Sequence, residues 1–519
     1  FGYRTVDLKS SATWPGNGAI PFEDDGLVKL TRTARISENS RYRDGFVQDT
    51  LTIANLTVNL GVRYDEQYGN NRPTTAPAAP WNDVLCDASL VPSQTNPCLP
   101  TLSYPGGEVE FRWKNWEPRV GLTFGIGPQK QTLLRASYAR FADQLGHTPI
   151  GFDNPLGYSY LYYFLSDAYS ARAAAGNHTI TGPADLAGFY YAYGVDPNDP
   201  TAQASVNTID PHLKAPTTDE YAIGIDHQIL PEFVAGLLYT HRERRNLTWT
   251  PYIGITSADY ALVLAGQEAF DTNGKPLGTT GPLYGVNGGY SGNFGKYLTN
   301  RPGYSTKYDD VELQLTKRLT NRWMAHGSFT WNNWKQKIGS SGCQDPTNTL
   351  TANGAACDDS SIAWFGGASN SGSFGNVYIN SKWNFNVSGL YQLPLNFNVA
   401  ANLYGRQGYP LPYYARENPH DGLGTRNVLI GNPDDHRNSN LYELDMRLEK
   451  VIPLFQKADL TLSMDVFNVL NSNTVLQKQI AGRCHDSNSP AICSGTATAN
   501  RIFEIQAPRT LRFGGRLSF

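Results

Sequence analysis

The 519-residue chain is poor in methionine, in charge and in long apolar runs. Charged residues make up 17% of it, below the roughly 25% of an ordinary soluble domain, and there are only 3 methionines. The 43 Lys and Arg against 46 Asp and Glu leave a net charge of −3, which gives no basic surface for nucleic acid. No stretch approaches about eighteen consecutive apolar residues, so membrane-spanning helices are excluded. Strands of a membrane barrel are not excluded, because their signal is alternation alone.

Motifs of catalysis and metal binding are also missing. The sequence has no GxSxG, HExxH, P-loop or GxGxxG pattern, and its 9 histidines are scattered. The stretch DDHR at 434–437 favours a solvated loop, and DPNDP at 196–200 favours a turn over a Ca²⁺ site because it lacks a spaced acidic ladder. We therefore predict no enzymatic activity, no cofactor and no metal site.

The cysteines are few and fall in close pairs, each inside a stretch rich in Gly, Pro, Ser or Asn. A metal site would need closely spaced thiolates with histidine partners, and only one cysteine has an adjacent histidine. The spacing predicts three local disulfides in an oxidising compartment. The expected pairs are Cys86 with Cys98, Cys343 with Cys357, and Cys484 with Cys493.

The sequence is rich in glycine (50) and tyrosine (30), and in segments that alternate between apolar and polar residues. The segment NLTVNLGVRYDEQYG, residues 55–69, places its large apolar residues on one face with the period of two that is typical of a strand. Such segments occur in pairs joined by very short turns, and their strands exceed the usual five or six residues. The predicted hairpins cover 42–69, 117–141, 220–245, 308–334, 382–407 and 442–471.

Long connections alternate strictly with these short turns. A compact soluble domain does not tolerate so many long connections, whereas outer-membrane barrels combine short periplasmic turns with long extracellular loops. A soluble β-sandwich with one wet face would explain the alternation but not this asymmetry. All three cysteine pairs lie in these long connections. The long connections run approximately over 13–41, 69–110, 143–216, 250–303, 336–379, 409–439 and 470–507.

The two faces of the late strands have different chemistry. Leu444, Leu462 and Phe513 lie on a face that fits lipid. The opposite face carries Asp445, Asp465 and Arg512. A charge on that face must reach water or an ion-pair partner. We therefore predict an all-β, transmembrane antiparallel barrel whose charged face lines a wide lumen. With a first strand at 1–11 and a last at 508–519, this chain supplies about fourteen strands.

Several segments resemble the carboxyl-terminal barrel of TonB-dependent outer-membrane receptors, in particular the Oar-like branch. They are GFVQDTLTIANLTVNLGVRYDEQYG, WEPRVGLTFGI with LLRASYARF, DVFNVLN, and the closing PRTLRFGGRLSF. The resemblance covers the strands and none of the loops. It implies that Phe519 is the terminal aromatic of the strand that closes the barrel seam.

The resemblance also implies a location and partners. The family has a plug inside a barrel of twenty-two strands, so residues 1–519 are expected to be the carboxyl-terminal portion of the barrel domain, without the plug and the first eight strands. The expected location is the bacterial outer membrane. The expected partners are outer-membrane lipid, the TonB complex through a plug that this chain lacks, and the remaining barrel portion or a separate chain. That last partner is expected to pair with residues 508–519 in place of residues 1–11.

The resemblance favours active import of a scarce ligand, such as a glycan, peptide or chelate, that the extracellular loops capture. A passive porin and a surface protein anchored by the barrel stay open as alternatives. The connection at 143–216 is the candidate for ligand binding, because planar tyrosine faces suit glycans or peptides. Packing of the loops against one another is the other interpretation of these aromatics. The candidate residues are Tyr158, Tyr160, Tyr162, Tyr163, Tyr190, Tyr191 and Tyr193.

Overall fold

A computed structural model describes most of the chain, and every structural statement below concerns the described residues. These are residues 1–14, 18–85, 97–157, 159–290, 295–337, 368–369, 377–378, 380–432, 434–455, 458–484, 493–494 and 497–519. Of the residues predicted to have a role, Tyr158, Cys86, Cys343 and Cys357 lie outside the described set, and only the backbone of Cys493 belongs to it.

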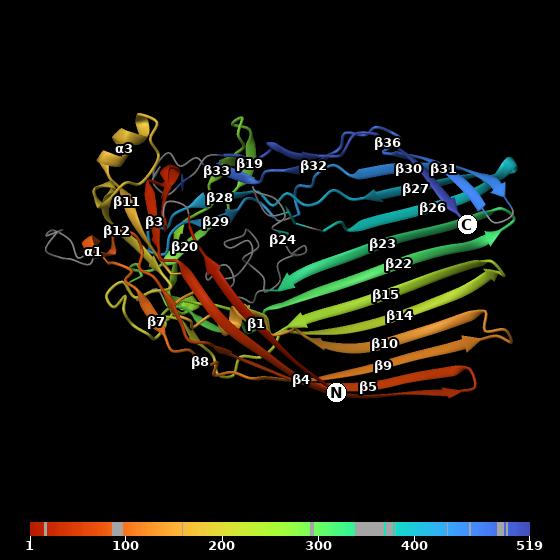
Figure 1. Cartoon of the computed structure of the whole chain (residues 1–519), viewed down its shortest axis with the longest axis horizontal. Helices are drawn as coiled ribbons and strands as arrows, with labels where there is room; N and C mark the ends of the chain where they lie inside the picture. The colour runs from red at the N-terminus through yellow and green to blue at the C-terminus, as the bar shows by residue number, and fades with distance from the viewer. Residues whose placement is uncertain are drawn as a thin grey trace.

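Long antiparallel strands lie side by side in one large sheet (Figure 1). Short turns gather at one end of the sheet and the long connections at the other, which we call the loop end. A short strand, β8 (Gly107–Glu108), adds to β5 outside the main order. The main order is β1 (Gly2–Ala12), β4 (Ala34–Ile53), β5 (Leu56–Asn71), β9 (Trp113–Ile126), β10 (Thr132–Ala142), β14 (Thr217–Leu230), β15 (Phe233–Arg245), β22 (Ser305–Thr320), β23 (Trp323–Lys337), β26 (Trp383–Leu393), β27 (Phe397–Arg406), β30 (Leu441–Phe455), β31 (Ala458–Phe467) and β36 (Thr510–Ser518).

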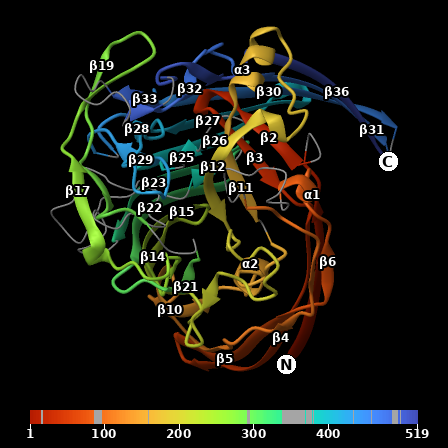
Figure 2. The same ribbon diagram turned by 90° about the vertical axis from the view of Figure 1, so that its left-hand side faces the viewer.

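This order confirms the fourteen strands and the six hairpins expected from the alternation. Strands that follow one another in the main order pair along their length, so the sheet has two edges, β1 and β36. Within the described residues no ladder joins these edges, and a ring closed between residues 1–11 and 508–519 is not formed here. Viewed from the loop end, the sheet forms a curved wall around the loop elements (Figure 2).

The turn between β22 and β23 shows why these hairpins are tight. It consists of Asn321 and Arg322, whose φ angles are 51° and 71°. Two consecutive residues with positive φ give a turn whose twist matches that of the flanking strands. Asparagine tolerates this conformation well, whereas arginine adopts it with steric strain.

The two faces of the wall have the predicted polarity. Asp465 on β31 lies opposite Arg447 on β30 and Arg512 on β36, with N···O distances of 3.4 and 2.8 Å. Leu462 and Phe513 lie on the other face and are exposed, which is the arrangement predicted for lipid contact. In this arrangement the apolar side chains contact lipid, and the charged side chains reach the aqueous lumen.

The polar face of the wall is the one that loop residues cover. Asp65 and Gln67 on β5 are fully buried. Gln67 Nε2 donates to the carbonyl of Asp143 at 3.1 Å, and the backbone N–H of Leu145 donates to Gln67 Oε1 at 2.6 Å. The start of the 143–216 connection is therefore held against the inner face of the barrel wall.

The loop end carries small sheets of its own. The sheet that matters for the site is four-stranded, in the order β12 (Leu186–Tyr193), β11 (Tyr160–Leu165), β3 (Leu27–Thr31) and β2 (Ala19–Phe22). Among the helices of the described ranges, none has the length and apolarity that crossing a membrane requires. The remaining strands are β6 (Thr74–Ala76), β7 (Leu102–Tyr104), β13 (Thr208–Ile209), β16 (Thr248–Trp249), β17 (Tyr260–Leu264), β18 (Glu268–Phe270), β19 (Pro276–Thr279), β20 (Leu283–Val286), β21 (Tyr297–Asn300), β24 (Ala368–Ser369), β25 (Val377–Tyr378), β28 (Tyr414–Glu417), β29 (Arg426–Leu429), β32 (Val475–Lys478), β33 (Ala481–Cys484), β34 (Cys493–Ser494) and β35 (Ile502–Ile505). The helical elements are α1 (Asn82–Leu85), α2 (His147–Ile150), α3 (Asp167–Ala174), η2 (Glu23–Asp25), η3 (Pro183–Asp185), η4 (Ser257–Asp259) and η5 (Pro394–Asn396).

The long loops have buried apolar cores of their own. Val28, Leu161 and Tyr163 belong to one buried cluster, and Tyr413 and Ile430 belong to another, all of them in the connections. The physical reason is that the wall directs its apolar face outward, so the buried apolar side chains of the loops pack against one another.

The described cysteines lie in these loop cores. Cys98 is buried in the first cluster and Cys484 in the second, and neither carries a free thiol. Because the side chains of their expected partners lie outside the described residues, the three disulfide pairings stay predictions.

Candidate ligand-binding site at the loop end

Four of the tyrosines predicted to bind ligand share one face of the small four-stranded sheet. Tyr160 lies opposite Tyr193, and Tyr162 lies opposite Tyr191. The rings of Tyr160 and Tyr193 stack, with centroids 4.9 Å apart and planes 11° from parallel, and Tyr162 meets Tyr160 edge-on at 5.2 Å. All four side chains are partly exposed. We call these four residues the tyrosine face.

The intervening residues point to the opposite side of the sheet, as the strand period requires. Tyr163 is 1% exposed, packs edge-on against Phe189 at 5.9 Å and donates its hydroxyl to the carbonyl of Pro97. Burial also raises the pKa of Tyr163. Tyr163 therefore packs the loops together and is not part of the tyrosine face.

Tyr190 also lies apart from the four. It falls at a register shift between β11 and β12, and its ring packs against Phe164 with centroids 5.1 Å apart. Of the seven tyrosines predicted as ligand-binding, the structure brings four together and places two elsewhere, while Tyr158 lies outside the described residues.

Two lysines from other loops border the tyrosine face. Lys29 on β3 lies opposite Tyr162, and its Nζ is 4.6 Å from the ring centroid of Tyr160. Lys296 Nζ lies 5.0 Å from the ring of Tyr193 and 4.9 Å from that of Tyr252. Ammonium groups at these distances from a ring face attract its π-electrons.

Burial lowers the pKa of Lys296 and raises the pKa of Tyr191 and of Tyr252, whose hydroxyl oxygens are 3.4 Å apart. Lys29, Lys296 and Tyr252 were not predicted as site residues. No local pattern marks them, since they come from the connections before β4 and before β22 and meet the tyrosines only through the packing of the loops.

A cavity of about 350 Å³ adjoins the tyrosine face. Tyr193 contributes to its lining, together with Glu38 on β4 and His147 on α2. The Glu38 side chain is 1% exposed, and its Oε2 lies 3.2 Å from His147 Nδ1. Gly151, directly after α2, leaves room for this carboxylate, because a Cβ there would lie 2.0 Å from Glu38 Oε1. The site thus combines an aromatic face, two ammonium groups and a cavity with a buried carboxylate.

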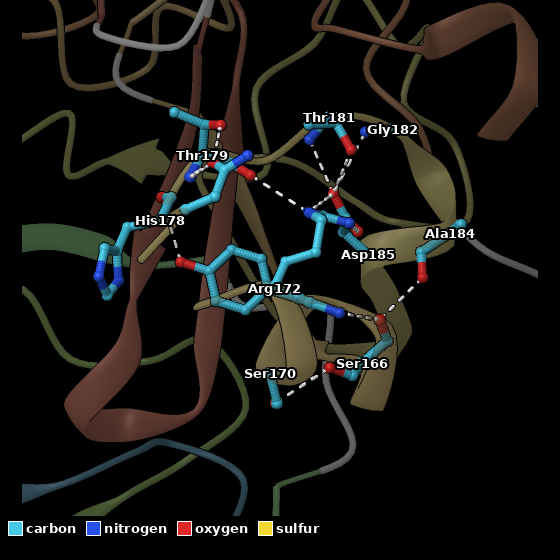
Figure 3. Close-up of polar contacts among 11 residues, drawn as sticks. Ser166, Ser170, Arg172, His178, Thr179, Thr181, Gly182, Ala184 and Asp185 are labelled. Atoms are coloured by element: carbon cyan, nitrogen blue, oxygen red, sulfur yellow. Dashed lines mark hydrogen bonds and ion pairs between the residues drawn. The ribbon is translucent and has the colours of Figure 1, made fainter. Parts of the chain in front are cut away.

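A network of polar contacts fixes the segment between β11 and β12 (Figure 3). Asp185, with a side chain 1% exposed, accepts two hydrogen bonds of 2.7 Å from Arg172 on α3. The same carboxylate accepts from the backbone N–H groups of Thr181 and Gly182, at 2.7 and 3.3 Å. Hydrogen bonds from Arg172, and from Thr181, lower the pKa of Asp185 to about 2 against the desolvation that burial brings. This network holds the ends of the two strands that carry the tyrosine face.

Two further features of the structure concern metal binding. In the residues that it describes, no group of His, Cys, Asp or Glu side chains is arranged to hold a metal ion. The DPNDP stretch forms a turn in which the backbone N–H of Asn198 donates to Asp196 Oδ1 at 2.8 Å.

Comparison with known proteins places the chain in a family. Residues 26–405 match the family model described as outer membrane beta barrel domain, so the chain belongs to that family and lies in the outer membrane. The antiparallel wall, the exposed apolar face and the alternation of short turns and long loops agree with this assignment. The loop end is accordingly the extracellular end.

The sequence also resembles that of a curated protein. It is 23% identical to the TonB-dependent transporter Oar of Myxococcus xanthus over 332 residues, which are 60% of this chain and 24% of that protein. The chain therefore spans about a quarter of the length of this relative. This similarity confirms the resemblance found in the sequence.

The chain is also similar to the solved structures of an import receptor and of an outer membrane transporter. The ferric-catecholate import receptor Fiu of Escherichia coli K12 has a TM-score of 0.46 and 10% identity, over 99% of this chain and 54% of that one. The outer membrane transporter YddB of Escherichia coli has a TM-score of 0.42 and 12% identity, over 93% of this chain and 55% of that one.

Proposed function

We propose that this chain is the main part of the barrel of an active import receptor, which captures a ligand at the tyrosine face and releases it inward with energy from TonB. The observation that carries the proposal is the tyrosine face itself. Its rings are partly exposed at the extracellular end, come from two paired strands and are bordered by the ammonium groups of Lys29 and Lys296.

The chemistry of the face indicates the class of ligand. Stacked tyrosine rings offer planar, amphipathic contact to a sugar ring, a peptide or an aromatic chelate. The ammonium group of Lys296, which is partly exposed, favours a ligand that also carries negative charge, and the adjoining cavity of about 350 Å³ holds a group of moderate size. An acidic glycan, an acidic peptide or an anionic chelate meets these conditions.

The proposed energy coupling involves parts that this chain does not contain. We propose that a plug and eight upstream strands complete the receptor, with the upstream strands pairing along the β36 edge, where Phe519 ends the chain. Support for this arrangement comes from the sequence resemblance to a TonB-dependent transporter and from the two edges of the wall.

Native mass spectrometry of the full-length protein purified from its own source tests the ligand site. The natural protein is expected to carry a bound mass that is lost in a Tyr160→Ala, Tyr193→Ala double variant. The matched control is Tyr391→Ala, a tyrosine exposed near the turn end of the wall. Retention of the same mass by the double variant would contradict the proposed site.

Two further measurements separate import from the alternatives. Accumulation of the identified ligand is expected to stop when TonB is deleted, because a plugged barrel needs that energy. Conductance of the full-length protein in a planar bilayer is expected to be low. A large, steady conductance together with TonB-independent uptake would identify a passive channel instead.

A further inference from the structure

On the lipid-facing side of the wall, apolar, aromatic and charged rows of side chains follow one another toward the loop end. On β15, β22 and β23, Leu237, Leu313 and Phe329 lie opposite one another and are exposed. Two residues closer to the loop end, Tyr239 and Trp331 flank Val311 in the next row of the same face. Exposed aromatic side chains above an apolar band mark the boundary between acyl chains and headgroups.

Charged residues occupy the same face above this aromatic row. Glu243, Lys307 and Lys335 lie opposite one another, four residues beyond the aromatic row. Lys307 and Lys335 are like charges in directly opposed positions, an arrangement that is unfavourable unless an anion lies nearby. Lys337 lies two residues further along the same face of β23 and extends the positive row.

A cavity of about 570 Å³ opens at this level. Five cationic side chains contribute to its lining: Lys214, Arg245, Arg301, Lys307 and Lys337. Among the lining residues they outnumber the two carboxylates, Asp210 and Glu243, by three.

Both carboxylates are already engaged within the protein. Arg245 Nη2 lies 2.6 Å from Glu243 Oε2, and Lys307 Nζ lies 3.7 Å from Glu243 Oε1. Thr299 Oγ1 donates to Asp210 Oδ2 at 2.6 Å. A third carboxylate of this face, Asp309 in the row between, lies 2.7 Å from His241 Nδ1. Among the described residues, no carboxylate forms an ion pair with Lys335 or Lys337.

The height of the cavity above the aromatic row indicates which kind of molecule it binds. Four residues of strand correspond to about 13 Å, or about 10 Å along the membrane normal for a tilted barrel strand. The cavity therefore lies about 10 Å above the aromatic row, at the level of the lipid headgroups. It opens on the outer side of the wall and not in the lumen, because Glu243, Lys307 and Lys337 share the face of the apolar rows. We propose that it binds the phosphate groups of a lipid headgroup in the outer leaflet, whose acyl chains lie along the apolar rows below.

This site is separate from the tyrosine face and does not depend on the proposed import function. Basic pockets at headgroup level attract anionic lipid by charge, and several phosphate oxygens can meet several ammonium and guanidinium groups at once. The lipid would also cover the row of opposed lysines and remove their repulsion.

The test uses the full-length protein in detergent micelles and titrates it with lipid A, a bisphosphorylated glycolipid, under native mass spectrometry. A triple variant, Lys307→Gln with Lys335→Gln and Lys337→Gln, is expected to bind lipid A at least tenfold more weakly than the natural protein. Because the substitutions remove like-charge repulsion, the variant is expected to fold, and its heat-dependent shift in gel mobility checks this.

The matched control removes three positive charges elsewhere, with Lys130→Gln, Lys275→Gln and Lys478→Gln, and is expected to bind lipid A normally. Equal loss of binding in both triple variants would overturn the site. Inorganic pyrophosphate serves as the soluble anion. If pyrophosphate binds the natural protein as tightly as lipid A does, the lipid source is refuted; weak competition by pyrophosphate supports it.

Discussion

Replacement of Asp185 by asparagine is expected to loosen the segment between β11 and β12 while the barrel wall stays intact. The carboxylate accepts two hydrogen bonds from Arg172 and further ones from Thr181 and Gly182. Asparagine keeps the size of the side chain and one acceptor oxygen, but it removes the charge that Arg172 contacts. Arg172 is itself one-third exposed, so its charge can turn to water.

The magnitude follows from the pKa of Asp185, which falls from 3.8 to about 2 in the folded protein. One pKa unit corresponds to about 1.4 kcal/mol, so the charged form stabilises the folded segment by about 2 kcal/mol. Because the folded pKa is the lower one, this contribution is present above about pH 4 and is lost as the pH falls through about 2.

Hydrogen exchange measured by mass spectrometry on the full-length protein at pH 7 is the assay. Amides of α3 and of residues 181–186 are expected to exchange roughly 30-fold faster in Asp185→Asn, because local opening sets their exchange rate. Asp167→Asn is the control, since Asp167 is an exposed carboxylate in the first turn of the same helix. Unchanged exchange in Asp185→Asn, or equal acceleration in both variants, would refute the assignment of this network as the anchor of the tyrosine face.

Other substitutions probe the wall and the cavity beside the site. Leu462→Arg places a charge on the lipid face and is expected to cost about 2 to 4 kcal/mol in urea unfolding of the liposome-folded full-length protein, whereas Ser463→Arg points into the lumen and is expected to be tolerated; equal costs would show that the register is wrong. Gly151→Ala drives a Cβ against Glu38 Oε1 and is expected to destabilise α2 by about 1 to 3 kcal/mol, as read from its hydrogen exchange, while Gly146→Ala, with no atom within 4 Å of its Cβ, serves as the control. Arg322→Gly relieves a positive φ of 71° and is expected to stabilise the barrel by up to about 1 kcal/mol in urea unfolding, with an unchanged or lower midpoint counting against strain in that turn.

The sequence by itself determined the wall. Alternation is a local property, because successive side chains of a strand face opposite ways and one face must meet lipid. The predicted connection at 143–216 therefore fits between Ala142, the end of β10, and Thr217, the start of β14. The assignment of Leu462 to the lipid face and Asp465 to the lumen rests on the same local signal.

Only the tertiary structure decided what the loops do. β11 pairs with β3, more than a hundred residues earlier, and this pairing brings Lys29 to Tyr160. Tyrosines that look alike in the sequence then differ in role, since Tyr162 lies on the tyrosine face and Tyr163 is buried in a loop core. Such contacts depend on which loops meet above the barrel, and no short stretch of sequence encodes that meeting, because the partners are distant in the chain and their pairing is set by packing.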